Sequence, residues 1–196
     1  MSRFLVVILV VASILGLVLP AVASVKYDVA EAVIGDAGAF PVKRGFIEEK
    51  LGKPDFTENA AGFPAPLEVY VVEDSDELSH IFLIYGAGED GNESYAMGAV
   101  MKGIDFATMM GMLEFMGEEN AQMVILRGEK FAVLDIVGVE APQVLWGLLE
   151  ERTFQGETHL VSILIPPANL VPYFAMAYQD FEEPLKKAIE ERAKKK

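Results

Sequence analysis

Four short apolar runs decide the fold: residues 95–101 (YAMGAVM), 122–127 (QMVILR), 130–137 (KFAVLDIV) and 158–165 (THLVSILI). Each run is rich in β-branched or other aliphatic side chains and is bounded by charged or turn-forming residues, which is typical of β-strands. Only two residues, Gly128 and Glu129, separate the second run from the third, so these two runs are expected to pair as a hairpin. The runs therefore predict an antiparallel sheet.

Two helices are predicted between these strands. Residues 105–116 (DFATMMGMLEFM) place Phe106 and Leu113 on one side at helical spacing, and residues 142–152 (PQVLWGLLEER) begin with a proline that suits a first helical turn. The succession is then β-α-β-β-α-β, the order of a ferredoxin-like unit over about residues 95–165. The sequence thus predicts the α+β class, an antiparallel sheet with helices on one face.

The chain on either side of this unit adds a hairpin and a helical tail. Residues 67–72 and 80–85 are β-branched and aromatic runs that predict an extra N-terminal β-hairpin. Residues 46–51 are predicted as a short helix because a glycine follows them. Residues 170–178 and the Lys-rich segment 180–196 predict further helical pieces, with a kink near a proline in the second.

The first two dozen residues indicate where the protein works. Arg3 precedes the uncharged apolar run 4–19, and the small residues of an AVA triplet stand directly before Ser24. This is the three-part layout of a secretory signal peptide, so residues 1–23 are predicted to be a signal peptide or, if uncleaved, a signal anchor. The remaining residues 24–196 fit one domain, and we expect it to be extracytoplasmic.

Residues 160–179 are an alternative candidate for a second membrane span. His159 and Asp180 bracket twenty residues without a formal charge, which is long enough to cross a bilayer. Three prolines within this stretch would leave backbone groups unpaired in lipid. The sequence therefore favours a strand followed by a helix.

Composition excludes several classes of function. The chain has no cysteine, so thiol chemistry and Cys-based zinc sites are excluded, and an exported domain of this kind, most consistent with a prokaryotic origin, must be stable without disulfides. The formal net charge is −14, and residues 54–185 carry four basic against 23 acidic residues. Such a field repels nucleic acid. Membrane association stays open through residues 4–23 or through the Lys-rich tail, whose basic residues can instead complement a helix dipole.

Two acidic loops are candidate calcium ligands. Their carboxylates are Glu73, Asp74, Asp76, Glu89, Asp90 and Glu93. Clustered carboxylates suit calcium, but neither loop has the spacing of an EF-hand. Because one loop joins the two strands of the predicted hairpin and the other leaves its second strand, they are expected at opposite ends and cannot share one ion. Solvated turns are the favoured interpretation.

Seven methionines are a candidate copper site. They are Met97, Met101, Met109, Met110, Met112, Met116 and Met123. Thioethers suit Cu(I), yet Met109, Met112 and Met116 share a helical stripe with Phe106 and Leu113, which is typical of a packed core. The favoured interpretation is therefore packing rather than metal binding.

The sequence contains no motif that specifically indicates a catalytic site. Residues 86–91 (GAGEDG) match G-x-G-x-x-G, but two acids within the motif would repel a pyrophosphate. Asp135 interrupts an apolar strand and is expected to be partly buried. In the ferredoxin-like order the strands of Asp135 and His159 flank the first strand and leave the pair ~10 Å apart, too far for acid-base chemistry. We therefore expect a non-enzymatic module that binds or assembles with another protein; the alternatives are an extracytoplasmic metal-binding protein and a hydrolase with an unrecognised site.

Overall fold

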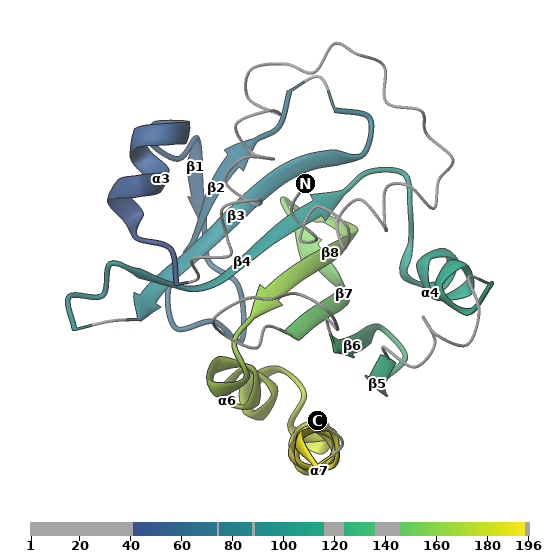
Figure 1. The fold of residues 1–196 in the computed structure, drawn as a ribbon. Helices are drawn as coiled ribbons and strands as arrows, with labels where there is room; N and C mark the ends of the chain where they lie inside the picture. Colours follow the sequence, from purple (N-terminus) through teal and green to yellow (C-terminus); the bar gives the residue numbers. More distant parts are fainter. Residues whose placement is uncertain (1–40, 74, 88, 116–123, 136–145, 195–196) are drawn as a thin grey trace.

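The computed structural model confirms the α+β class. It describes residues 41–73, 75–87, 89–115, 124–135 and 146–194. In these residues one eight-stranded antiparallel sheet is accompanied by four α-helices (Figure 1). The predictions for residues 1–23 lie outside the described residues.

The strands form two groups of four along the chain. The first group is β1 (Phe56–Glu58), β2 (Leu67–Val71), β3 (Leu78–Ala87) and β4 (Glu93–Met101). The second is β5 (Val124–Arg127), β6 (Phe131–Asp135), β7 (Trp146–Phe154) and β8 (Glu157–Ile165). The helices are α3 (Arg44–Leu51), α4 (Phe106–Phe115), α6 (Pro167–Ala177) and α7 (Glu182–Ala193), with a 3₁₀ turn, η2 (Gln179–Phe181), before the last.

The sheet joins these two groups through their last strands. Its order is β1-β2-β3-β4-β8-β7-β6-β5, and Met97 of β4 pairs with Leu164 of β8. Within each group neighbouring strands are consecutive along the chain. The β7–β8 connection is a two-residue turn, in which Gln155 and Gly156 both have positive φ, 50° and 84°. Such a turn matches the right-handed twist of paired strands.

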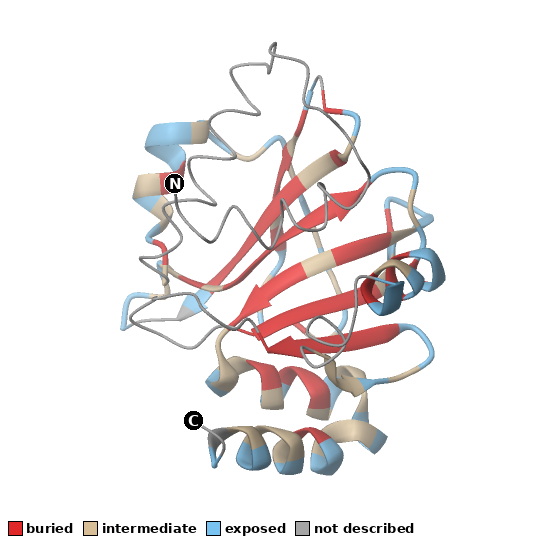
Figure 2. Cartoon of the chain, turned by 45° about the vertical axis from the view of Figure 1, so that its right-hand side comes forward, coloured by how far each residue is buried: buried red, intermediate tan, exposed pale blue. Residues whose placement is uncertain are grey.

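Helices cover both faces of the sheet, which corrects the prediction that they lie on one face. Ile47 of α3 and Met109 of α4 belong to one buried cluster, and Phe174 of α6 and Leu185 of α7 belong to the other. We call these sides the α4 face and the α6 face. Figure 2 shows that the central strands are almost wholly buried, as expected for a sheet covered on both sides.

The predicted helix at residues 142–152 is wrong from Trp146 onward. Residues 146–154 form β7, and residues 142–145 lie outside the described part of the chain. Because β7 is buried on both faces, its apolar run shows no polar alternation, and such a run cannot be told from a buried helix by period. The described order after β4 is therefore α4, β5, β6, β7 and β8, without the second helix of a ferredoxin-like unit.

Other predicted elements are confirmed. β2 and β3 form the expected hairpin, with Val69 opposite Phe82. Helix α3 ends at Gly52, whose φ of 79° suits glycine. Residues 160–179 run from β8 into α6 rather than through one helix. Among the described residues no helix is long and apolar enough to cross a membrane.

The segment between β1 and β2 reaches across the α6 face to β7 and α6. Arg152 of β7 donates a hydrogen bond to the Ala61 carbonyl, and the Phe63 ring stacks on Tyr173 with 4.7 Å between centroids. Gly62 lies between them with a φ of 88°, where an added Cβ would stand 2.7 Å from the Tyr173 ring. Glycine is therefore required for this close approach, which closes the α6 face of the core.

Candidate functional site

The two acidic loops lie at opposite ends of β3, as the sequence predicts. Glu73 and Asp76 lie in the β2–β3 connection, whereas Glu89 and Asp90 lie in the β3–β4 connection and Glu93 begins β4. Asp74 lies outside the described residues. In the described part of the chain no three His, Asp or Glu side chains gather closely enough to hold a metal. Calcium binding by these loops stays an untested alternative to solvated turns.

The G-x-G-x-x-G motif lies in a hairpin connection. β3 and β4 pair up to Ala87 and Glu93, so a strand follows the loop where a phosphate site would need a helix N-terminus. Asp90 accepts a hydrogen bond from the backbone N–H of Asn92 at 3.1 Å, and this contact lowers the pKa of the Asp90 carboxyl. The motif thus serves a tight acidic turn.

The described methionines pack in the core of the α4 face. Met97, Met101, Met109 and Met110 are buried there, and Met112 is half-buried. Met116 and Met123 lie outside the described residues. The buried side of α4 is completed by Phe106 and Leu113. Of the predicted stripe, Met109 is therefore confirmed as a core residue, whereas half-buried Met112 is not fully part of the core.

The predicted relation between Asp135 and His159 is wrong in its topology. Of the two strands that carry these residues, only β8, with His159, neighbours β4; β6, with Asp135, is separated from β8 by β7. Asp135, expected to be partly buried, is fully buried and is paired with Arg192 of α7. His80 packs against the Phe154 ring with 4.9 Å between centroids, and its burial lowers the pKa of its imidazole. The histidines and Asp135 do not form an acid-base site.

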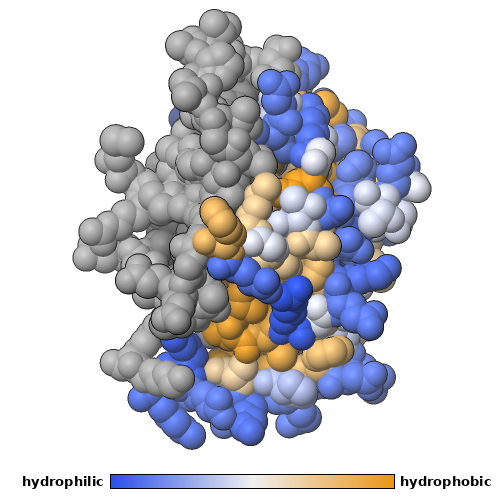
Figure 3. Space-filling model, turned by 90° about the vertical axis from the view of Figure 1, so that its right-hand side faces the viewer, coloured by the Kyte–Doolittle hydropathy of each residue, from blue (hydrophilic) through white to orange (hydrophobic). Residues whose placement is uncertain are grey.

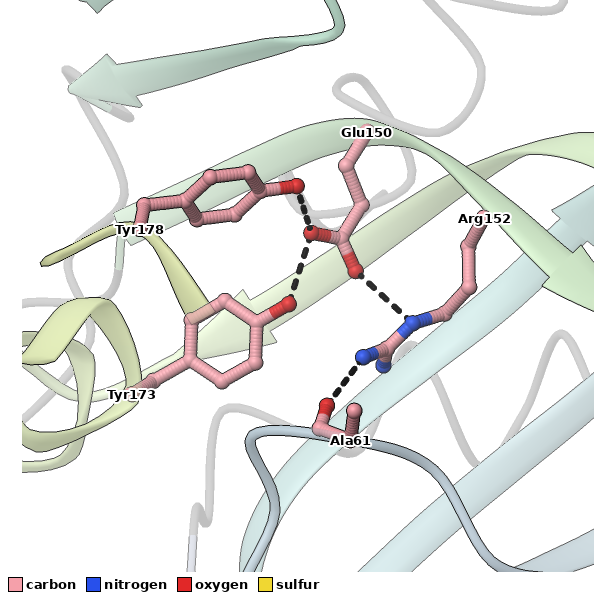
Figure 4. A network of polar contacts seen from close by, with 5 residues as sticks. All are labelled: Ala61, Glu150, Arg152, Tyr173 and Tyr178. Atoms are coloured by element: carbon pink, nitrogen blue, oxygen red, sulfur yellow. Dashed lines mark hydrogen bonds and ion pairs between the residues drawn. The ribbon is translucent and has the colours of Figure 1, made fainter. Parts of the chain in front are cut away.

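A buried carboxylate that the sequence analysis missed lies on β7 (Figure 4). Glu150 is 1% exposed and accepts hydrogen bonds at its Oε2 from Tyr173 at 2.7 Å and from Tyr178 at 2.8 Å. The Nε of Arg152 lies 3.3 Å from its Oε1. The guanidinium of Arg152 lies 4.8 Å from the centroid of the Phe63 ring.

This Glu150 network connects β7, α6 and the β1–β2 connection, and its chemistry is structural. Burial and the neighbouring Glu150 charge raise the pKa values of Tyr173 and Tyr178, so both phenols stay protonated and donate. The carboxylate is enclosed by these donors and by Arg152, which leaves no exposed oxygen for a substrate. The predicted helix at residues 142–152 had hidden this network, because in a helix Glu150 and Arg152 do not share a face.

The most exposed large apolar side chain in the described residues is Phe115, at the end of α4. It is 92% exposed. On the sheet-edge strand β5, Val124 is half-buried against the α4 face, whereas Ile125 and Leu126 are half-buried against the α6 face. Figure 3 shows the side of the molecule that bears α4 and β5: hydrophobic atoms gather in its lower central part among hydrophilic ones. We call Phe115, Val124 and half-buried Met112 the α4–β5 surface.

The basic residues of α7 are paired with acids. Lys186 lies 2.7 Å from Glu182 and 2.6 Å from Glu183, and Lys187 lies 3.9 Å from Glu191. These contacts are the local ones expected of a solvated helix. They lower the positive charge that α7 presents to an anionic membrane.

Comparisons with protein-family models, with curated proteins and with solved structures gave no match to this chain. The functional assignment therefore follows from the geometry and from the sequence pattern.

Proposed function

We propose that this protein is an extracytoplasmic, non-enzymatic module that binds another protein through the α4–β5 surface. The observation that carries the proposal is Phe115, an aromatic side chain that is 92% exposed at the end of α4. Apolar side chains grouped on a soluble surface mark sites of protein interaction. Fully burying one phenylalanine contributes ~1.5–3 kcal/mol, and aromatic anchors of this kind dominate many interfaces.

Charge supports a protein with a basic rim as the partner. The chain has a formal net charge of −14, and the Arg127 side chain beside the surface is already paired with Glu114. Anionic lipid and nucleic acid would be repelled by this field, whereas lysines and arginines around an apolar contact would be attracted. A second copy of the chain would bring the same negative charge and is less favoured.

Export is supported by residues 1–23 alone. Their charge, apolar run and small-residue triplet match a signal peptide, with Ser24 as the first mature residue. A non-enzymatic role is supported by the enclosure of Glu150 and Asp135, the two buried carboxylates of the described residues, which bind tyrosines or arginines of the protein itself.

Site-specific crosslinking tests the proposal. A photoreactive phenylalanine analogue at position 115 should give a discrete crosslinked protein species in cells that express the full chain. The matched control is position 176, since Met176 is also apolar and 67% exposed but lies on α6. Equal crosslinking at both positions, or none at position 115 in the native host, would contradict the proposed surface.

A further inference from the structure

Four buried polar atoms without a hydrogen-bond partner lie around one place between α3 and the β2–β3 hairpin. They are Arg44 Nε, Glu68 Oε2, Tyr70 Oη and Tyr85 Oη. Tyr70 is 5% exposed and Tyr85 is 2% exposed. Buried polar groups in proteins nearly always have a partner, and one left without a partner costs free energy. Four together require an explanation.

The neighbouring contacts show which hydrogen-bonding atoms of these side chains remain available. Arg44 already binds Glu68 Oε1 at 2.8 Å and Asn92 Oδ1 at 3.1 Å, and its guanidinium lies 4.6 Å from the centroid of the Tyr85 ring. Glu68 and Tyr70 are two residues apart on β2 and therefore point to the same face as Tyr85, the α4 face. No member of the set is bonded to another through the four atoms that are left over.

The remaining atoms favour a ligand that donates hydrogen bonds. Glu68 Oε2 can only accept, Arg44 Nε can only donate, and each tyrosine oxygen can do either, so a ligand that donates hydrogen bonds meets up to three acceptors. The electrostatic field of the charged groups around Tyr70 is negative. Burial, then Glu68, Glu48 and Asp55, raise the pKa of Tyr70 to about 12, and only Arg44 opposes them.

We propose that Arg44, Glu68, Tyr70 and Tyr85 form a binding site for a small molecule that carries a primary ammonium group. The three ammonium N–H groups match Glu68 Oε2 and the two phenol oxygens, and a hydroxyl or carboxylate oxygen on the same molecule can accept from Arg44 Nε. Arg44 and Glu68 are the side of the set from which a ligand would approach, since their side chains are 36% and 15% exposed. This site is separate from the α4–β5 surface and does not depend on the proposed function.

Methylammonium chloride is the probe, with potassium chloride at equal ionic strength as the reference. Amide resonances of β2 and β3 should shift in a saturable manner with methylammonium at millimolar concentration, and the melting temperature should rise, whereas potassium should produce neither effect. Tyr70→Phe, Tyr85→Phe and Glu68→Gln should each weaken methylammonium binding at least tenfold. Glu68→Gln keeps the size of the side chain and serves if a tyrosine variant does not fold.

Tyr95→Phe is the matched control. The Tyr95 hydroxyl already donates to the Asn169 carbonyl at 2.8 Å, so this variant loses a hydrogen bond but should keep its response to methylammonium. Two results would overturn the proposal. If Tyr70→Phe and Tyr85→Phe raise the melting temperature and methylammonium has no effect, the hydroxyls are simply unpaired. If both variants lower the melting temperature and methylammonium still has no effect, only water fills the place.

Discussion

Replacing Glu150 by alanine should be among the most destabilising single changes in this chain. The side chain is 1% exposed and is the shared acceptor of the Tyr173 and Tyr178 hydroxyls, at 2.7 and 2.8 Å. It is also the charge partner of Arg152, which is itself only 13% exposed. The truncation therefore leaves a mostly buried cation without its anion and two buried donors without their acceptor.

The magnitude follows from these groups. Removing one member of a buried ion pair costs ~3–5 kcal/mol, because the remaining charge is uncompensated. Arg152 keeps the Ala61 carbonyl and the Phe63 ring, which favours the lower end. Each hydroxyl left without a partner adds ~1–3 kcal/mol, although the terms are not additive within one network. We expect ~4–6 kcal/mol in total, a fall in melting temperature of about 10–20 °C for a domain of this size.

Urea denaturation of residues 24–196 measures the change. Glu157→Ala is the control, since its side chain is 82% exposed and should alter the free energy of unfolding by less than ~0.5 kcal/mol. If Glu150→Ala does not fold, Glu150→Gln keeps an acceptor oxygen and should retain about half of the lost stability. A loss below ~1 kcal/mol for Glu150→Ala would refute the reasoning, because the network would then contribute no more than a surface residue.

Four further predictions follow from the sequence and the structure. Met109→Ala should cost ~2–5 kcal/mol in urea denaturation because Met109 is fully buried, whereas exposed Met176→Ala should change stability by less than ~0.5 kcal/mol. Gly98→Ala should cost ~1–3 kcal/mol, since an added Cβ would overlap the Phe82 ring and stand 2.7 Å from a backbone carbonyl; an unchanged unfolding midpoint would contradict this packing. Calcium and magnesium at a few millimolar should raise the melting temperature equally, and a larger rise with calcium alone would restore the acidic-loop metal site. Mass spectrometry of the natively expressed protein should find an N-terminus at Ser24 or within a residue or two; a mature species that retains Met1 would indicate a signal anchor.

Local pattern was enough to predict most of the fold. The β2–β3 hairpin alternates between the two faces, and α4 carries Phe106 and Leu113 seven residues apart, so each element shows its period within its own length. The prediction for the residues of β7 was wrong for a definite reason. From Trp146 to Glu150 its residues are buried on both faces, so the polarity that separates a strand from a helix is absent from that run.

The buried polar contacts also divide into features that the sequence could predict and features that it could not. Asp135 could be predicted to be partly buried because it interrupts an apolar strand, but its partner Arg192 stands 57 residues later in a helix with several basic residues. Glu150 was missed together with its strand. Tyr173 and Tyr178, 23 and 28 residues away, carry no local mark that they share one acceptor. Such contacts depend on strand order, which no local period encodes.

The arginines show how a chain without cysteine connects distant parts of this fold. All four arginines in the described residues pair with a carboxylate: Arg44 with Glu68, Arg127 with Glu114, Arg152 with Glu150 and Arg192 with Asp135. Three of these pairs join a helix to the sheet, and the fourth holds the β1–β2 connection through Ala61. Lys186 and Lys187, by contrast, pair within α7. The guanidinium carries five donors in a fixed planar arrangement, so one arginine can bind a carboxylate and a second group at once, as Arg44 and Arg152 do. These long-range contacts join α3, α4 and α7 to the sheet in addition to the two apolar clusters, in a chain that has no disulfides. The exposed Arg127–Glu114 pair contributes the least of them.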